Sequence, residues 1–182
     1  MPPRRHRKPP PPLDEPALRE LALSYVGRFS TTRAKLRAYL ARKVRERGWS
    51  GARTPDFDNL AEAMAERNYV DDAAYALSKS HALTGRGYGA RRVAQKLRAA
   101  GVEEGDGAAA LDHAEAEAVV AALRFAERRR IGPFATGDKD REQRSKAIGA
   151  MVRAGHDFDL AKAIVDLPAG RAIDADELRD RL

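Results

Sequence analysis

The residues of this chain that could carry chemistry are mainly basic side chains, which recur along the sequence with occasional aromatic residues among them. The 182 residues include 34 Lys and Arg against 27 Asp and Glu, a formal net charge of +7. Lysine and arginine neutralise phosphates, and an exposed aromatic ring can stack on a base. The sequence therefore predicts a surface that binds DNA or an acidic partner. The candidates for this surface are Lys35, Arg42, Arg45, Arg86, Tyr88, Arg91, Arg92, Lys96, Arg98, Arg128, Arg129 and Arg130.

Spacing decides which of these side chains could act together. Lys35, Arg42 and Arg45 are separated by seven and three residues, so a helix over 31–47 would place them on one face. The consecutive residues Arg128 to Arg130 spread over about 300° of a helix and cannot all face one partner. For every basic run, ordinary solvated surface is the alternative interpretation.

The segment Gly85-Arg86-Gly87-Tyr88-Gly89 precedes a predicted helix and has two interpretations. The N–H groups at a helix N-terminus bind anions, and Arg86, Arg91 and Arg92 would add positive charge. The same glycines could instead form a flexible joint between two helices. A nucleotide-binding P-loop is a poor fit, because no strand precedes the segment and no Gly-Lys-Ser/Thr follows. Tyr88 could stack on a base or anchor the adjoining helix.

Sequence patterns for catalysis or metal binding are missing. The chain has no cysteine, which excludes disulfides, thiolate metal sites and cysteine nucleophiles. Its four histidines do not have the spacing of a helical metal site. A helix N-terminus explains the adjacent carboxylates of Asp71 and Asp72, through capping and through the helix macrodipole. We therefore expect no enzyme activity, no catalytic or metal-binding residues and no cofactor.

Three glycines mark the helices that must position the basic residues. Gly48, Gly101 and Gly155 are 53 and 54 residues apart (48 to 101, 101 to 155), and each follows an apolar residue by four positions. This pattern is typical of a Schellman helix stop, in which glycine takes a left-handed conformation. The nearly equal spacing indicates an internal repeat, and the abundance of Ala, Leu, Arg and Glu makes that repeat helical.

The predicted fold is all-α, with three tandem three-helix repeats that form an elongated, curved array. Each repeat is too small to bury its own faces, so stacking on its neighbours has to complete the core. Within the first repeat we expect a helix cap at 30–32 and a capping box from Asn59 to Glu62. The expected segments are a disordered basic, proline-rich arm at 1–14, helical repeats at 15–70, 71–114 and 115–168, and a C-terminal tail at 169–182 that could be helical.

Three segments of the second repeat follow one another in a distinctive order. They are Tyr69-Val70-Asp71-Asp72-Ala73-Ala74-Tyr75-Ala76, Gly87-Tyr88-Gly89-Ala90-Arg91-Arg92-Val93 and Lys96-Leu97-Arg98-Ala99-Ala100-Gly101-Val102. This order resembles the RecX family, whose members regulate the RecA recombinase. The first repeat, through Lys35-Leu36 and Arg47-Gly48-Trp49, and the third, from Lys146 to Gly155 and Phe158, resemble the family's flanking repeats. The resemblance covers roughly residues 17–167 and leaves the arm at 1–12 without a counterpart.

The resemblance implies a regulator without catalytic activity, which binds the RecA–DNA filament and inhibits the recombinase in homologous recombination, DNA repair and the SOS response. Its basic faces would approach single-stranded or double-stranded DNA. The alternative is an independent DNA- or RNA-binding helical protein without a recombinase partner. The sequence has no long apolar run and no secretory signal pattern, so we expect a cytoplasmic protein that does not bind membranes. We also expect it to act as a monomer.

Overall fold

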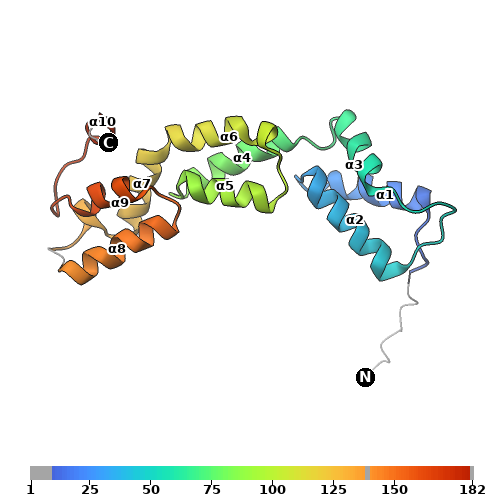
Figure 1. Ribbon diagram of the computed structural model, residues 1–182, viewed down its shortest axis with the longest axis horizontal. Coiled ribbons are helices and arrows are strands. Elements are labelled where there is room, and N and C mark those ends of the chain that lie inside the picture. Colours follow the sequence, from blue (N-terminus) through green and yellow to red (C-terminus); the bar gives the residue numbers. More distant parts are fainter. Residues whose placement is uncertain (1–9, 138–139, 181–182) are drawn as a thin grey trace, which may run out of the picture. The chain divides into compact units, whose positions relative to one another are not determined.

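The computed structural model describes residues 10–137 and 140–180 (Figure 1). Within these ranges the secondary structure consists of ten α-helices and one short 3-10 turn, without a β-strand, which confirms the all-α prediction. Most of the predicted arm at 1–14 lies outside the described residues, as do the last two residues of the predicted tail. The chain forms two compact units, Met1–Asp72 and Ala73–Leu182.

Three helices build the first unit around one apolar core. They are α1 (Glu15–Val26), α2 (Arg33–Arg47) and α3 (Phe57–Glu66). On α2, the fully buried Leu36 and Leu40 are one helical turn apart, so one face of this helix points inward and its basic residues occupy the remaining faces. The buried members of the core are Leu13, Leu18, Ala22, Leu36, Leu40, Ala61, Met64 and Val70.

Side-chain caps determine where the helices of the first unit begin. The Thr32 hydroxyl accepts a hydrogen bond from the Lys35 N–H at 3.1 Å, which confirms the predicted cap of α2. Asp56 caps α3 by accepting from the Asn59 N–H at 2.9 Å. The predicted capping box from Asn59 to Glu62 is therefore wrong, because Asn59 already lies inside the first turn.

Asp72 lies at a helix N-terminus, as predicted, and it also contacts α2. It is the first residue of α4 (Asp72–Thr84), and only 5% of it is exposed. Its carboxylate accepts hydrogen bonds from the Arg33 main-chain N–H at 2.9 Å and from the Arg33 Nε at 3.5 Å. Arg33 also forms an ion pair with Glu62 at 3.3 Å. Asp72 thus ties the end of the first unit to the first turn of α2.

Two groups of helices build the second unit. The helices α4, α5 and α6 share a core around Val93 and Leu97, while α7 to α10 share another around Met151 and Ile164. Tyr88 packs against both cores and so links the two groups. After α4, the elements are α5 (Ala90–Ala99), α6 (Glu104–Ala116), α7 (Ala118–Arg129), the 3-10 turn η1 (Gly132–Phe134), α8 (Arg141–Arg153), α9 (Phe158–Val165) and α10 (Ala175–Asp180).

Among the described residues, five helices end in the Schellman pattern, and two of these ends were predicted from glycine spacing. In each, one residue has a positive φ, and its N–H and the next N–H donate to carbonyls three and five residues earlier. The stops at Gly101 and Gly155 confirm the prediction. The five residues and their φ values are Asn68 (58°), Gly87 (74°), Gly101 (69°), Arg130 (53°) and Gly155 (97°).

The end of α2 at Gly48 differs from the prediction. Gly48 has φ 87° and ψ 167°, and its N–H donates to the Val44 carbonyl at 2.8 Å. The chain then runs extended, and Trp49 forms a parallel bridge with Leu13. A Schellman stop is excluded here because the residues after Gly48 pair with the segment before α1 instead of folding back onto α2.

Candidate binding hollow

A hollow of about 430 Å³ lies in the second unit, where the loop before α5 meets α7 and α8. It combines two aromatic rings with three arginines, and its described lining includes no acidic side chain. The predicted binding residues Tyr88, Arg128 and Arg129 come together here. We call this site the basic hollow; its lining residues are Tyr88, Phe125, Arg128, Arg129, Ala150, Arg153 and Ala154.

Main-chain hydrogen bonds hold the loop of the basic hollow against the end of α8. The Gly89 N–H donates to the Ala154 carbonyl at 3.1 Å, and the Arg91 N–H donates to the Gly155 carbonyl at 3.2 Å. A Cβ atom at Gly89 would overlap the Gly155 main chain. Glycine is required at this position because the two backbones approach too closely for a side chain.

These bonds exclude an anion site formed by the main chain of the glycine-rich loop. Every main-chain N–H of residues 85–89 donates to a carbonyl of the chain itself, so none is available to a phosphate. The loop is a joint between helices, as one of the two interpretations predicted. It is held in place by packing and hydrogen bonds, whereas the prediction was a flexible joint. Tyr88 anchors it, since its partly buried ring packs against both cores and also lines the hollow.

His156 closes the same joint from the inside. It is 1% exposed, and its Nε2 lies 3.1 Å from the Gly87 carbonyl oxygen, which requires Nε2 to carry the proton and donate. Burial lowers the pKa of His156 from its ordinary value, and the bond to Gly87 offsets this only in part. A neutral imidazole therefore packs 5.6 Å from the Phe125 ring, between centroids, behind the wall of the hollow.

The arginines of the basic hollow have no carboxylate partner among the residues that the structure describes. Arg128, Arg129 and Arg153 are all exposed, and no described Asp or Glu lies within ion-pair distance of them. The guanidinium carbon of Arg129 lies 5.8 Å from the centroid of the Phe125 ring. Three such guanidinium groups can donate hydrogen bonds to the oxygens of a phosphate or a carboxylate.

The other predicted residues of α5 and its loop lie outside the basic hollow. Arg91 forms an ion pair with Asp157 at 2.6 Å, and Arg92 donates to the Gln95 side chain at 2.8 Å. These contacts hold the two guanidinium groups within the unit. Arg86, Lys96 and Arg98 are exposed on the loop and on α5.

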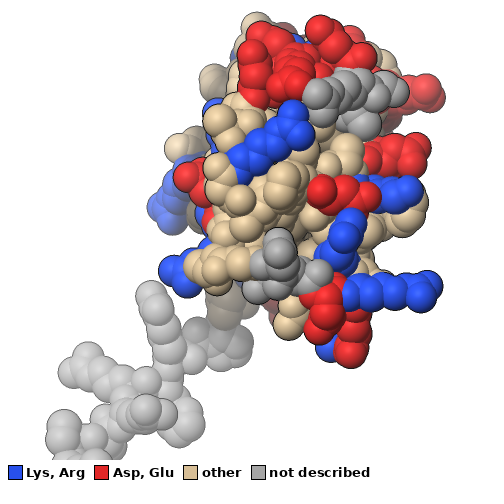
Figure 2. Space-filling view, turned by 90° about the vertical axis from the view of Figure 1, so that its left-hand side faces the viewer, with Lys and Arg blue, Asp and Glu red and all other residues tan. Residues whose placement is uncertain are grey.

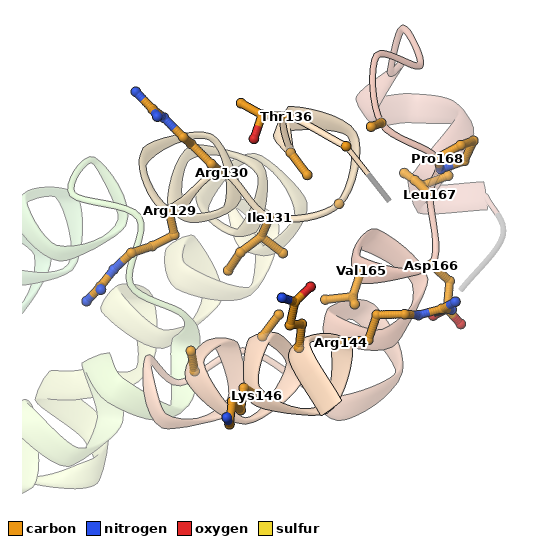
Figure 3. Close-up of a pocket in the computed structure, with 17 residues that line it drawn as sticks. Arg129, Arg130, Ile131, Thr136, Arg144, Lys146, Val165, Asp166, Leu167 and Pro168 are labelled. Carbon is orange, nitrogen blue, oxygen red and sulfur yellow. Dashed lines mark hydrogen bonds and ion pairs between the residues drawn. The ribbon is translucent and has the colours of Figure 1, made fainter. Parts of the chain in front are cut away.

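Arg130 does not line the basic hollow. Figure 3 shows Arg129 and Arg130 leaving the end of α7 in different directions, beside a second cavity of about 670 Å³ between α7, α8 and residues 165–169. Inside that cavity Ile131 and Val165 point toward one another, whereas Arg144 is held by Asp166. The three consecutive arginines therefore do not face one partner, as their spacing predicts.

The first unit has a basic face of its own on α2, which carries Lys35, Arg42 and Arg45. Arg42 lies 3.7 Å from the Glu46 carboxylate, and Lys43 lies 2.7 Å from it. The hydrogen bond from Lys43 is the main cause that lowers the pKa of Glu46. Part of the positive charge of this face is therefore balanced on the helix itself.

Three residues of these basic surfaces were not among the sequence candidates. Phe125 precedes Arg128 and Arg129 by three and four positions, and that helical spacing is a usable signal. Lys43 follows Tyr39 by four positions, and its Nζ lies 5.9 Å from the centroid of that ring. The role of Arg153 has no local signal, because it depends on how α8 packs against α7.

The structure also brings two histidines together that are far apart in sequence. The ring centroids of His81 and His113 lie 3.8 Å apart, and the His113 Nδ1 is 3.0 Å from the Ser80 hydroxyl oxygen. That hydroxyl donates to the Ala110 carbonyl at 2.7 Å, so it accepts from His113 and joins α4 to α6. Among the described residues no group of three potential metal ligands forms around this pair or elsewhere.

Comparisons with known proteins identify the family of this chain. A family model described as RecX, second three-helix domain, matches residues 71–111. The chain is 33% identical over 157 residues to the regulatory protein RecX of Myxococcus xanthus, across 82% of this chain and 84% of that protein. The chain belongs to the RecX family.

Two further RecX proteins match over most of their length. Those of Agrobacterium fabrum and Halorhodospira halophila are 29% and 30% identical to this chain. The matches span 86% and 90% of this chain and 85% and 92% of the two relatives. All three relatives are named regulatory proteins. No helix in the described part of this RecX chain is long and apolar enough to cross a bilayer.

Proposed function

We propose that this RecX chain binds the RecA filament on DNA and inhibits recombinase activity in homologous recombination, DNA repair and the SOS response. The observation that carries the proposal is the match to proteins named regulatory protein RecX over 82–90% of the chain. Within the chain, the basic hollow supports a role on a nucleic-acid filament, because it offers three guanidinium groups beside two aromatic rings.

In this proposal the basic hollow contacts the DNA of the filament. Phosphate oxygens would accept hydrogen bonds from Arg128, Arg129 and Arg153, and the ring of Tyr88 would lie beside the sugar or the base. The basic face of α2 would add a second, weaker contact. A regulator that touches a filament at several places gains affinity because each further contact is intramolecular.

The basic hollow also favours a second candidate function, binding to DNA or RNA without a recombinase partner. Salt dependence helps to separate the two candidates. Direct contacts with phosphates release counterions, so the logarithm of the affinity falls with the logarithm of the salt concentration by about 0.7 for each contact with a single strand. When binding depends on contacts between protein surfaces, the salt dependence is not proportional to a number of phosphate contacts.

The deciding experiment is a pull-down of the full chain on RecA–single-stranded DNA filaments, on naked single-stranded DNA and on free RecA. We expect the filament to retain much more protein than either component, and we expect ATP hydrolysis and strand exchange by RecA to fall at stoichiometric concentrations. Equal retention on naked DNA and on filaments, with unchanged recombinase activity, would favour the independent nucleic-acid-binding function.

A paired substitution tests the basic hollow within that experiment. The double variant Arg128→Glu, Arg129→Glu reverses two unpaired charges of the hollow, and its matched control Lys96→Glu, Arg98→Glu reverses two exposed charges on α5. We expect the first variant to bind filaments at least about tenfold more weakly and the control to change affinity about threefold or less. The hollow has no role in binding if both variants lose the same affinity.

A further inference from the structure

A groove between α8 and α9 forms a second surface, which shares Arg153 with the basic hollow and differs from it in chemistry. Its volume is about 740 Å³. The floor is apolar and the rim is basic. We call it the α8–α9 groove, with a floor of Ile148, Val152 and Phe158 and a rim that includes Arg141, Arg153 and Lys162.

Helical spacing explains how the floor and the rim form. On α8, Arg141, Ile148 and Val152 follow one another by seven and four residues and share one face. On α9, Phe158 and Lys162 are one turn apart on the face beside it. Because α8 and α9 pack against one another, the two stripes become the walls of one groove.

The floor exposes more apolar surface than a solvated helix pair needs. Phe158, the first residue of α9, is 53% exposed, and Ile148 and Val152 are only partly buried. Exposed apolar side chains that adjoin one another in a concave surface are typical of protein interaction sites. The α8–α9 groove therefore has the shape and polarity of a docking surface.

The rim determines which partner would fit. Arg141, Arg153 and Lys162 have no ion-pair partner among the described residues, and the carboxylate of Asp166 at the end of the groove is already held by Arg144. Figure 2 faces this end of the unit and shows acidic side chains gathered at the top, and Lys and Arg lower down with further Asp and Glu among them. The complementary partner carries carboxylates around an apolar stripe.

We propose that the α8–α9 groove binds an acidic amphipathic helix of a protein partner. Apolar side chains of that helix, three or four residues apart, pack on Ile148, Val152 and Phe158, and its flanking Asp and Glu side chains pair with the rim. A nucleic acid fits less well, because a sugar–phosphate backbone would leave the aliphatic floor without an apolar partner. The inference does not depend on RecA being the partner.

The test uses the full chain and a fluorescein-labelled synthetic peptide of about 14 residues, four helical turns long. The peptide has Leu and Phe on one helical face and Asp or Glu at most other positions. Fluorescence polarisation measures its affinity, and two comparison probes are used: a peptide of the same composition whose apolar residues are scattered, and a labelled oligo-dT. We expect binding of the amphipathic peptide that is at least about tenfold tighter than that of the scattered peptide.

Substitutions locate the site. Phe158→Ala should weaken peptide binding about tenfold. Lys162→Glu reverses a rim charge, so it should also weaken peptide binding, and by a larger factor at low salt than at high salt. The matched control is Phe29→Ala, since Phe29 is 55% exposed on the first unit and Phe158 is 53% exposed. Circular dichroism of each variant shows whether the helices are intact.

Three outcomes would overturn the proposal. Equal affinities for the amphipathic and the scattered peptide would show that only charge is recognised. Peptide binding that survives both Phe158→Ala and Lys162→Glu would move the site elsewhere. Oligo-dT binding that depends on Phe158, with no peptide binding, would make the groove a nucleic-acid site. A failure of RecA binding in the filament pull-down would leave this result unaffected, so the two proposals fail separately.

Discussion

The basic face of α2 in the first unit and the basic hollow in the second contain similar residues in different electrostatic states. On α2, the cations that pair with carboxylates of their own unit include Arg33, Arg37, Arg42 and Lys43. In the basic hollow none of the three arginines has such a partner among the described residues. The exposed pairs among these contribute little to stability, yet every pair leaves less positive potential for an external anion. Charge counted along the sequence therefore overstates what the first unit offers to DNA.

The two surfaces also differ in how firmly their backbone is held. The face of α2 is a single continuous helix, whereas the hollow is assembled from a loop and two helices that meet through the close approach of Gly89 and Gly155. A side chain introduced at Gly89 should therefore disrupt the hollow and leave the face of α2 intact. This difference is the first test of the comparison.

The largest expected effect is that of Gly89→Ala. The new Cβ would overlap the Gly155 main chain, and overpacking of this kind costs about 2–3 kcal/mol. Urea unfolding followed by circular dichroism should show the loss. Hydrogen exchange should place it in the second unit, with exchange in α1 to α3 unchanged.

Gly105→Ala is the matched control for that substitution. Gly105 lies within α6, and a Cβ there would meet no atom within 4 Å. We expect this variant to be more stable by up to about 1 kcal/mol, because alanine favours the helix. Similar destabilisation by both variants would show that the close approach at Gly89 is unimportant.

Charge reversal gives the next largest effect and compares the two surfaces directly. Arg128→Glu, Arg129→Glu should weaken filament binding at least about tenfold, or 1.4 kcal/mol, whereas Arg42→Glu, Lys43→Glu on α2 should weaken it about threefold or less. Titrations at several salt concentrations should also show a shallower salt dependence for the first variant only. Equal losses of filament affinity would show that the two surfaces contribute equally to binding, and would contradict the role assigned to ion pairing.

Acid should destabilise the second unit through His156. Because burial lowers the folded-state pKa of His156, the unfolded chain takes up a proton first as the pH falls below about 6.5. Stability is therefore complete above that pH and declines below it, by at most about 1.4 kcal/mol per pH unit for one proton. Urea unfolding at pH 7.5 and pH 5.5 measures the decline.

Two variants show whether this acid sensitivity belongs to the joint. His156→Gln should lose its part of the pH dependence, since a glutamine amide does not titrate, whereas His81→Gln on the exposed side of α4 should retain it. Hydrogen exchange should report the change in the second unit, because residues 10–72 contain no histidine. An unchanged pH dependence in His156→Gln would contradict the prediction.

The smallest effect is expected at Arg130, the candidate that lies outside the basic hollow. Arg130 has φ 53° in a position that favours glycine, and a left-handed arginine costs about 1 kcal/mol. Arg130→Gly should therefore raise the free energy of unfolding by up to about 1 kcal/mol and change filament affinity by less than about twofold. A clear loss of filament binding would show that the strained backbone is retained for a contact made by Arg130.

The sequence was sufficient to predict helices and several of their ends, because those depend on local interactions. Thr32 and the stops at Gly101 and Gly155 are examples. Stops at Asn68 and Arg130 have the same geometry but were not predicted, since neither residue has the conformational freedom of glycine that made the pattern visible. The error at Gly48 has a tertiary cause, namely the pairing of Trp49 with Leu13.

The binding surfaces were predictable only in part, because they depend on tertiary packing. The spacing of Tyr88, Arg128 and Arg129 gave no measure of their distance in space, and only the packing of α7 and α8 adds Arg153 to them. Ion pairing was equally hidden, because Arg91 and Asp157 are 66 residues apart. Local sequence shows which residues carry charge, while the fold determines which charges remain available.

The joint at Gly89 and Gly155 also has a consequence for the helix dipoles. The N-terminal end of α5, with its partial positive charge, meets the C-terminal end of α8, with its partial negative charge, through hydrogen bonds from Gly89 and Arg91. Each end neutralises the other, so the joint itself presents little field to its surroundings. The positive potential near this joint then depends on side chains, and single substitutions of arginine can adjust it without altering the backbone.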